Sequence, residues 1–581
     1  MANKEKLEKT RHSLAHLLAA AVLELYPKAL PTIGPTIENG FYYDFDFGHI
    51  KISEEALPKI EKMMRKILPS WHSYEERELN RIDAKKEYRE NPYKKELIDE
   101  IAEKKEKITF YKFGKFEDLC RGGHLKNPAE EIDPEAFRLL SVAGAYWKGD
   151  EKNKMLTRIY AAAFESKKEL EAHLLTLEEA KKRDHRKLGK ELDLFVFSEL
   201  VGAGLPLWTP KGTLVRHLLD DFVWQLRKER GYERVEIPHL TKKNLYEKSG
   251  HWAKFGDDLF RIKTREGHEF AIKPMNCPHH TQIFARKTWS YKEMPQRYAD
   301  TTMVYRDEQT GELHGLSRVR SITQDDAHVF CREKQAKEEA MKIWDIVETF
   351  YKTFGFELKV KLSIHDKDNM DRFMGDVSGW EKAVEDFKSW IEEKGAEYGL
   401  GVGEAAFYGP KIDFIAKDSL GREWQVATIQ IDRSMPESFD LYCINEKNEK
   451  ERVVMLHAAI MGSIERFLSV YLEHSAGIFP LWLSPEQIFI LPVAKDHNAF
   501  AWQTCNKLRK AGLRVRVDDN SEPLGKKIRR TKISKIPYYM VIGGNEMTSD
   551  KLKIEDRNGK AEEMDLKNLI EKLKKEIESR S

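Results

Sequence analysis

The sequence predicts a multidomain α+β protein that ends in an α/β domain. Two observations support this fold class. At 581 residues, the chain is too long to fold around a single hydrophobic core. Helix-period segments and short strand-like runs are mixed through most of the chain, whereas residues after about 485 alternate regularly between strand and helix patterns.

Four segments follow from shifts in composition. Residues 1–165 mix helical stretches with strand-like runs such as GFYYDFDF, and residues 166–192 are highly charged with apolar residues at helical spacing. We interpret the latter as a solvated linker helix. Residues 193–480 hold many aromatics and strand-like runs, which predict a sheet rather than a bundle. Residues 481–581 are predicted to form a small domain with a largely parallel or mixed sheet.

Composition narrows the class of protein. Hydrophobic residues make up 41% and charged residues 34%, while the net charge of +2 is too small to indicate a nucleic-acid binder, so any such binding needs local basic patches. No apolar run approaches the ~20 residues that span a membrane. The N-terminal segment is interpreted as an amphipathic helix rather than a signal peptide. Five widely spaced cysteines indicate a reducing, cytoplasmic location.

One cysteine and two histidines, far apart in the chain, lie in segments suited to metal chemistry. Cys277 lies in KPMNCPHH, His328 in RSITQDDAHVFC and His457 in VVMLHAAIMGSIERF. Three such ligands with an open fourth position are typical of a catalytic or substrate-binding zinc. His279 and His280 are alternatives to Cys277, although a thiolate is the better zinc anchor.

Several arginines lie where a phosphate could be bound. Residues 302–328 are predicted to form a strand, a loop and a strand, with Arg306 ending the first strand and Arg318 and Arg320 beginning the second. Arg466 lies on a predicted helix. Converging guanidinium groups suit a nucleotide whose α-phosphate is attacked, and surface ion pairs are the alternative. Neither a P-loop nor a Rossmann fingerprint is present.

These segments resemble a known family. Residues 302–328 and the helix with Glu465-Arg466 resemble motifs 2 and 3 of class II aminoacyl-tRNA synthetases, and VWQLRKERGYERVEIPHL (223–240) resembles motif 1, the dimerisation element. MNCP, QDDAH and the GSIER helix preceded by His457 resemble the threonyl-tRNA synthetase family in particular. The resemblance covers essentially residues 1–581.

The resemblance implies a fold and an activity. Residues 193–480 would form a class II catalytic domain on an antiparallel sheet, residues 1–165 an α+β editing domain, and residues 481–581 an α/β anticodon-binding domain. A homodimeric ligase would activate threonine with ATP and transfer it to tRNA(Thr). The small ubiquitin-like TGS domain that often precedes the editing domain in this family is expected to be missing.

The resemblance also implies site residues. One zinc per subunit would be held by Cys277, His328 and His457, with threonine filling the open position. Threonine contacts would be Gln324, Asp326, Tyr408 and Gln430. ATP contacts would be Arg306, Glu308, Arg318, Gln425 and Arg466, with Mg²⁺ on the phosphates and Glu308 as a candidate carboxylate. The catalytic set would be Arg306, Arg466 and His251, the last as a proton relay near the tRNA hydroxyl.

A second His/Cys set occurs near the N-terminus. His12 and His16 are one helical turn apart, and Cys120 and His124 form a similar pair downstream. A metal site and buried histidines are both compatible with this spacing. The resemblance implies instead a hydrolytic editing pocket, completed by Tyr42, Lys94 and Asp118. Such a pocket is needed because serine differs from threonine by one methyl group, which discriminates by only about 10–200-fold.

The C-terminal helix LGKKIRRTKISK (524–535) is predicted to carry a basic face. The resemblance places anticodon contacts at Lys535 and Glu546. Ser521, Lys535 and Glu555 depart from the residues usual in the family, so the details of base readout stay open.

Three alternative functions are compatible with parts of the sequence. They are a zinc hydrolase acting on aminoacyl-tRNA alone, a non-catalytic RNA-binding relative, and a sister synthetase for serine or proline. The arginines argue against the first two, because neither needs an ATP clamp.

Overall fold

The computed structural model describes residues 2–374 and 376–580, and the chain divides into two compact units, Met1–Glu179 and Ala180–Ser581. Within the described residues, no helix is both long and apolar enough to cross a membrane.

The first unit is built around helix α1 (Ala2–Leu25) and an antiparallel sheet. The apolar run of α1 from Leu14 to Val22 is buried and packs with the aromatic residues of β3 (Gly40–Asp46). The sheet order is β1-β3-β8-β7, with β2 paired to β3. Its other strands are β1 (Leu30–Pro31), β2 (Thr36–Ile37), β7 (Phe137–Tyr146) and β8 (Met155–Ala163).

A smaller sheet forms a separate part of the first unit. The antiparallel strands β4 (Glu75–Glu78), β5 (Thr109–Phe113) and β6 (Phe116–Leu119) form a sheet. The remaining longer helices are α2 (Leu57–Ile67), α3 (Arg81–Glu87) and α4 (Pro92–Glu103). Asn80 and Asn91 cap the last two by accepting hydrogen bonds from backbone amides, as expected for helix N-termini.

The predicted single linker helix is wrong in one respect, because the structure has two helices there. These are α6 (Lys167–Arg183) and α7 (His185–Glu191). Asp184 lies between them and its carboxylate accepts a hydrogen bond from the Arg186 amide, 2.8 Å away. A side chain that caps a helix start competes with continuation of the preceding helix.

The second unit contains an eight-stranded sheet that confirms the predicted class II architecture. Its order is β11-β16-β17-β24-β21-β20-β18-β19, antiparallel except for the two edge pairs. The strands are β11 (Glu233–Arg234), β16 (Gln296–Tyr305), β17 (Ser321–Cys331), β18 (Leu358–Ile364), β19 (Tyr398–Val402), β20 (Lys411–Lys417), β21 (Glu423–Asp432) and β24 (Val454–Ala459).

Amphipathic helices pack against this sheet and form the largest core of the molecule. They are α8 (Pro210–Lys228), α12 (Ala336–Thr353), α13 (Val377–Glu393) and α15 (Ile464–His474). A separate short helix, α11 (Cys277–Phe284), packs against β17 in a second cluster. This region also has a two-stranded sheet of β9 (Phe195–Val196) and β10 (Leu207–Trp208). Two three-stranded sheets have the orders β12-β14-β13 (Leu240–Lys242, Glu269–Ile272, Arg261–Lys263) and β15-β22-β23 (Trp289–Ser290, Tyr442–Ile444, Lys450–Arg452).

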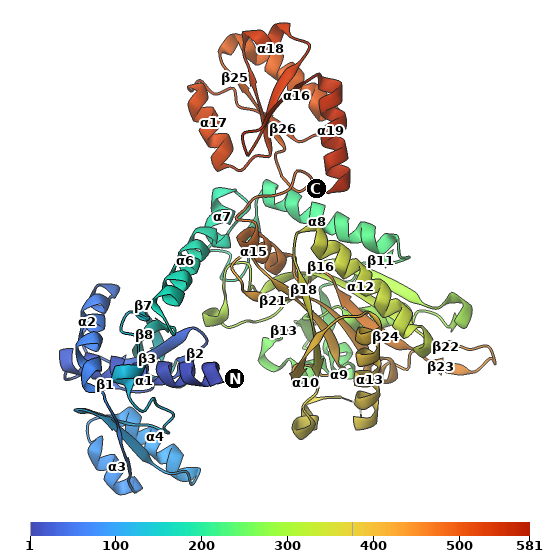
Figure 1. Ribbon diagram of the computed structural model, residues 1–581. Coiled ribbons are helices and arrows are strands. Elements are labelled where there is room, and N and C mark those ends of the chain that lie inside the picture. Colours follow the sequence, from blue (N-terminus) through green and yellow to red (C-terminus); the bar gives the residue numbers. More distant parts are fainter. Residues whose placement is uncertain (1, 375, 581) are drawn as a thin grey trace. The chain divides into compact units, whose positions relative to one another are not determined.

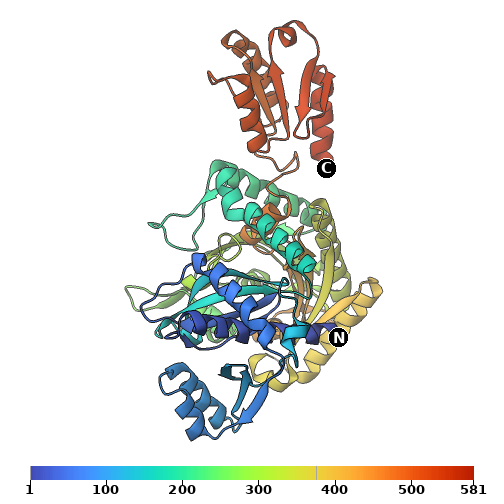
Figure 2. The same cartoon turned by 60° about the vertical axis from the view of Figure 1, so that its left-hand side comes forward.

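The C-terminal part of the second unit is an α/β layer structure, as predicted. Parallel strands lie at the centre and two antiparallel strands follow, in the order β26-β25-β27-β28-β29. In Figures 1 and 2 the red helices flank both sides of this sheet. The strands are β25 (Ile488–Pro492), β26 (Val515–Val517), β27 (Tyr538–Ile542), β28 (Leu552–Asp556) and β29 (Ala561–Met564), and the longer helices are α16 (Asn498–Lys510), α17 (Leu524–Ile533) and α19 (Leu566–Ser579).

Candidate active site

Cys277, His328 and His457 come together in a buried cluster. Sheet register places His328 of β17 directly beside His457 of β24, and helix α11 starts at Cys277. One potential ligand atom from each of the three residues lies within 4.8 Å of the other two. His328 Nε2 and His457 Nδ1 are 3.1 Å apart, so both rings turn a nitrogen toward the same point.

The surroundings of this cluster suit a cation. Burial lowers the pKa of His328 well below its usual range, so its ring is neutral and offers a lone pair. Burial raises the pKa of the Cys277 thiol well above normal, and metal binding would therefore release its proton. Asp326 and Asp432 add negative charge nearby, with Asp432 Oδ2 3.1 Å from His457 Nε2. These donors fit zinc.

His279 and His280 do not join the three-residue cluster, although both are buried. His280 Nδ1 lies 2.8 Å from His328 Nδ1, on the ring edge opposite the nitrogen that faces His457. Neither ring nitrogen of His279 has a partner among the described residues. The geometry therefore favours Cys277 as the third donor.

The residues expected to contact threonine line the sheet around this cluster. Gln430 of β21 is the cross-strand neighbour of His457, and the Tyr408 hydroxyl hydrogen-bonds the Gln430 side chain. Asp326 accepts a hydrogen bond of 3.0 Å from Asn276, and burial raises the pKa of Asp326 to about 6. Gln324 Oε1 is buried without a partner among the described residues. Gln324 therefore offers an unsatisfied acceptor to a small amino acid, and the other three groups lie beside it already hydrogen-bonded within the protein.

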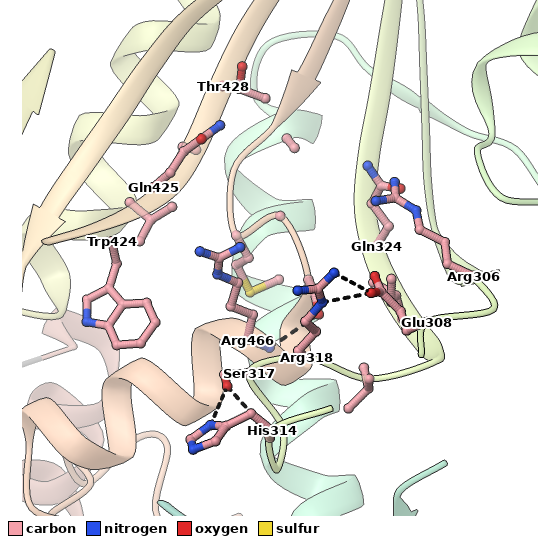
Figure 3. Close-up of a pocket in the computed structure, with 18 of the residues that line it drawn as sticks. Arg306, Glu308, His314, Ser317, Arg318, Gln324, Trp424, Gln425, Thr428 and Arg466 are labelled. Carbon is pink, nitrogen blue, oxygen red and sulfur yellow. Dashed lines mark hydrogen bonds and ion pairs between the residues drawn. The ribbon is translucent and has the colours of Figure 1, made fainter. Parts of the chain in front are cut away.

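A cavity of about 630 Å³ is lined by the five predicted ATP contacts, Arg306, Glu308, Arg318, Gln425 and Arg466. Figure 3 shows the arginines approaching it from the β16–β17 connection and from helix α15. Gln324 also lines this cavity, and Gln324 and Asp326 are on the same strand. The two predicted subsites are therefore neighbours.

The arginines differ in how they are held. Arg318 donates a hydrogen bond to Glu308 Oε2 at 2.7 Å. A magnesium ion bound by Glu308 would therefore share this carboxylate with the Arg318 guanidinium. Arg306 Nη2 contacts Met275 Sδ at 3.2 Å and its Nε has no partner among the described residues. Loss of hydration lowers the pKa of Arg306 and of Arg466, because it disfavours the charged guanidinium group. A bound anion would offset this cost.

Sequence reasoning assigned no role to Trp424 or to Glu465. The Trp424 ring lines the cavity with the Arg466 guanidinium 5.9 Å from its centroid, an arrangement suited to a flat base. Glu465 is buried and accepts hydrogen bonds of 2.8 Å from the Thr323 amide and hydroxyl, which tie α15 to β17. The resemblance placed Glu465 in motif 3, but it gave no indication that this side chain would join the helix to the sheet.

His251 is fully buried beside the Cys277–His328–His457 cluster. Its Nδ1 lies 2.9 Å from Ser249 Oγ and its Nε2 3.6 Å from Cys277 Sγ. Burial, with His457 nearby, lowers the pKa of His251 to about 3, so the ring is neutral at physiological pH. A neutral ring has one donor nitrogen and one acceptor nitrogen, which is the arrangement that a proton relay requires.

In the first unit, His12, His16, Cys120 and His124 form a second cluster. Cys120 Sγ lies 3.3 Å from both His12 Nε2 and His124 Nε2. Burial and the neighbouring histidines lower the pKa of His124 to about 2, and burial raises that of Cys120 to about 12. A cavity of about 440 Å³ opens beside this uncharged cluster.

Lys94 and Asp118 line the same cavity as a buried ion pair of 2.6 Å. Asp118 also accepts hydrogen bonds from Tyr43, at 2.5 Å, and from Tyr88, at 2.8 Å. Tyr42 lies elsewhere, with the Arg158 guanidinium 3.8 Å from its ring centroid. Adjacent residues of a strand face opposite sides of the sheet, so only one of Tyr42 and Tyr43 can face the cavity. The sequence did not indicate that Tyr43 would be the one.

The predicted basic face of α17 is only partly available. Lys527 is buried and donates to the Pro492 carbonyl at 2.9 Å, and Arg530 pairs with Asp518 at 2.9 Å. Lys535 donates to the Ala476 carbonyl, and Glu546 accepts a 2.8 Å hydrogen bond from the Gly543 amide. The exposed basic side chains of this helix are Lys526, Arg529 and Lys532.

Comparison with known proteins agrees with these features. A family model described as the tRNA synthetase class II core domain matches residues 260–475, which contain the strand–loop–strand, the Cys277–His328–His457 cluster and α15. A model of an anticodon binding domain matches residues 487–576, and one of the threonyl and alanyl tRNA synthetase second additional domain matches residues 108–160. The fold and the matched domains are thus those of a class II aminoacyl-tRNA synthetase.

Relatives that match nearly the whole chain identify the family within the class II aminoacyl-tRNA synthetases. A threonine–tRNA ligase from Porphyromonas gingivalis is 48% identical over 574 residues, covering 98% of this chain and 87% of the relative. One from Thermotoga maritima is 45% identical over 573 residues, covering 98% and 88%. A solved threonyl-tRNA synthetase RNA-binding domain from Cryptosporidium parvum matches with a TM-score of 0.65 and 35% identity over 68% of this chain and 98% of that one. The chain belongs to the threonine–tRNA ligase family.

Proposed function

We propose that this protein ligates threonine to tRNA(Thr) and removes serine attached to that tRNA by mistake. The threonine carboxylate would attack the α-phosphorus of ATP, giving threonyl-adenylate and releasing pyrophosphate. A terminal ribose hydroxyl of the tRNA would then attack the adenylate carbonyl and release AMP. The observation that carries this proposal is the buried Cys277–His328–His457 cluster next to the arginine-lined cavity.

Arg306 and Arg466 would stabilise the charge that grows on the α-phosphate. The Arg306 guanidinium is partly buried, which strengthens its interaction with a phosphate, whereas Arg466 is an exposed residue that lines the same cavity. Trp424 would pack against the adenine, and Gln425, held by a 2.7 Å hydrogen bond to Asp413, would orient the nucleotide. Mg²⁺ is proposed on the ATP phosphates, near Glu308.

Cys277, His328 and His457 would hold one zinc ion. When bound, zinc would supply a Lewis acid that recognises the threonine hydroxyl and amine. Valine lacks this hydroxyl, and a site built to bind an oxygen rejects such an analogue strongly. Asp326 would pair with the substrate ammonium, while Gln324, Tyr408 and Gln430 line the remaining contacts.

Serine keeps the hydroxyl, so a second site is needed. We assign serine removal to the cavity of the first unit, where His12, His16, Cys120 and His124 stay neutral beside the Lys94–Asp118 pair. Lys94 and His12 are proposed to position the attacking water. His251 is proposed to relay the proton of the tRNA hydroxyl in the ligation site.

The remaining assignments concern domains and partners. We propose an editing domain over residues 1–165, a linker over 166–192, a catalytic domain over 193–480 and an anticodon-binding domain over 481–581, with Lys535 and Glu546 near the anticodon. Dimerisation through α8 and β11 is supported by the position of β11 at the edge of its sheet. Five unpaired cysteines support a cytoplasmic location.

An amino-acid panel in the ATP–pyrophosphate exchange assay, with zinc measured in the same preparation, tests the proposal. Threonine should support exchange far better than valine, and serine should support some. No threonine-dependent exchange would exclude a ligase and leave a hydrolase acting on aminoacyl-tRNA.

A further inference from the structure

Two side chains without a role in the proposed function contact the outer edges of the two histidines in the metal cluster. The facing nitrogens, His328 Nε2 and His457 Nδ1, are 3.1 Å apart. On the opposite ring edges, His328 Nδ1 lies 2.8 Å from His280 Nδ1 and His457 Nε2 lies 3.1 Å from Asp432 Oδ2. Each ligand histidine therefore has one nitrogen toward the cluster and one toward a buried partner.

We propose that Asp432 and His280 are positioning residues that select the metal-binding tautomers of His457 and His328. This inference rests on the proposed metal site. A neutral imidazole carries one proton and one lone pair, so a nitrogen that binds a metal requires the proton on the other nitrogen. Partners that accept this proton orient the ring and raise the affinity for the metal.

A carboxylate has no proton to donate, so Asp432 in this form is an acceptor toward His457. Its side chain is fully buried, and Oδ1 accepts a 2.9 Å hydrogen bond from the Met435 amide, which leaves Oδ2 for the ring. The Nε2 proton of His457 is thereby retained at the outer edge. Nδ1 then keeps its lone pair toward the cluster.

His280 completes the same arrangement for His328. It follows Cys277 by three residues on α11, so one helix supplies both a metal ligand and the acceptor for another ligand. His280 accepts through Nδ1, which requires its own proton on Nε2. That nitrogen has no partner among the described residues.

His279 provides a matched control on the same helix. It is buried like its neighbour, but its ring nitrogens contact no polar group among the described residues. Substitution at His279 should disturb packing without affecting the tautomer of a ligand.

Asp432→Asn reverses the donor at one position. Asn Oδ1 can still accept from the Met435 amide, so Nδ2 would face His457 Nε2 and donate to it. The ring proton would move to Nδ1, and zinc affinity should fall about 10–100-fold. His280→Leu should produce a loss of similar size, whereas His280→Asn, which keeps an acceptor, should bind zinc within about threefold of wild type.

The measurement is the zinc dissociation constant, obtained by competition with a chromogenic chelator, together with the absorption spectrum of the Co²⁺-substituted full-length protein. Circular dichroism checks folding of each variant. Wild-type zinc affinity in Asp432→Asn and His280→Leu would overturn the inference, as would an equal loss in His279→Leu or in His280→Asn. A wild-type protein that binds no zinc would overturn the proposed metal site itself, which is a different result.

Discussion

The two His/Cys clusters of this protein use the same residue types in different surroundings. In the central cluster, the outer nitrogens of His328 and His457 contact His280 and Asp432. In the first unit, His124 Nδ1 is 3.5 Å from the Ser13 hydroxyl and His16 Nδ1 has no partner in the part of the chain that the structure describes.

The main difference between the two clusters is whether a carboxylate contacts one of the histidines. Asp432 contacts a histidine of the central cluster, whereas Asp118, the carboxylate near the first-unit cluster, is held by Lys94, Tyr43 and Tyr88. A carboxylate behind a histidine favours a bound cation. The two clusters share ligand types and close spacing of the ligand atoms, and they differ in the groups that contact the histidines from behind. This difference is the reason to propose a metal site in the central cluster and a neutral hydrolytic pocket in the first unit.

The largest expected effect is that of Cys277→Ser. Zinc content should fall and threonine-dependent exchange should drop by at least about 100-fold, because a catalytic zinc site has three protein ligands and none to spare. Removal of serine from Ser-tRNA(Thr) should be unchanged. Cys443→Ser, in the same buried apolar cluster, is the control and should keep both activities. Normal zinc and exchange in the Cys277 variant would contradict the assignment.

The converse variant is Cys120→Ala, which should leave zinc content and exchange at wild-type levels. Deacylation of Ser-tRNA(Thr) should fall about 100-fold, the usual scale for losing a positioned acid–base or water-orienting group. Cys505→Ala, buried in the C-terminal core, serves as the control. Loss of half the bound zinc in Cys120→Ala would instead show a second metal site.

The tyrosine pair tests which residue shapes the editing cavity. Tyr43→Phe removes a hydrogen bond to Asp118 and should slow deacylation by roughly tenfold, since hydrogen bonds to charged groups contribute about 1.5–3 kcal/mol. Tyr42→Phe should stay within about twofold. Equal rates for both variants would show that the strand face seen here is not the functional one.

The smallest expected effect is a loss of stability of the first unit in acid. The pKa of folded His124 is about 2, against an ordinary value near 6.5, so below pH 6.5 the unfolded chain takes up a proton that the folded unit does not. Stability is complete above pH 6.5 and falls as the pH drops. At pH 5.5 the contribution of His124 to this loss is about 1.4 kcal/mol, and His12 and His16, whose pKa values are also lowered by burial, add to it.

Hydrogen exchange of α1 at pH 7.5 and 5.5, corrected for intrinsic rates, measures this loss. His124→Gln should reduce the difference by the same amount. An unchanged pH dependence in this variant would show that His124 is protonated in the folded unit.

Much of the architecture could be predicted because local patterns carry it. The strands on either side of Arg306 and Arg318, the helix with Arg466 and the alternating C-terminal elements are found where the sequence placed them. Each depends on periodicity or turn residues within a short window. The break between α6 and α7 at Asp184 was not predicted, because the capping role of this residue depends on its side-chain conformation.

The amino-acid sequence by itself determined which residues could carry the chemistry, since Cys277, His328 and His457 each lie in a distinctive local motif. Only the tertiary structure decided which side chains contact the two histidines from behind. Asp432 lies 25 residues from His457 in sequence, and His280 lies 48 from His328. Strand register and the placement of α11 bring these pairs into contact. Long-range packing sets such distances, and no local pattern encodes them.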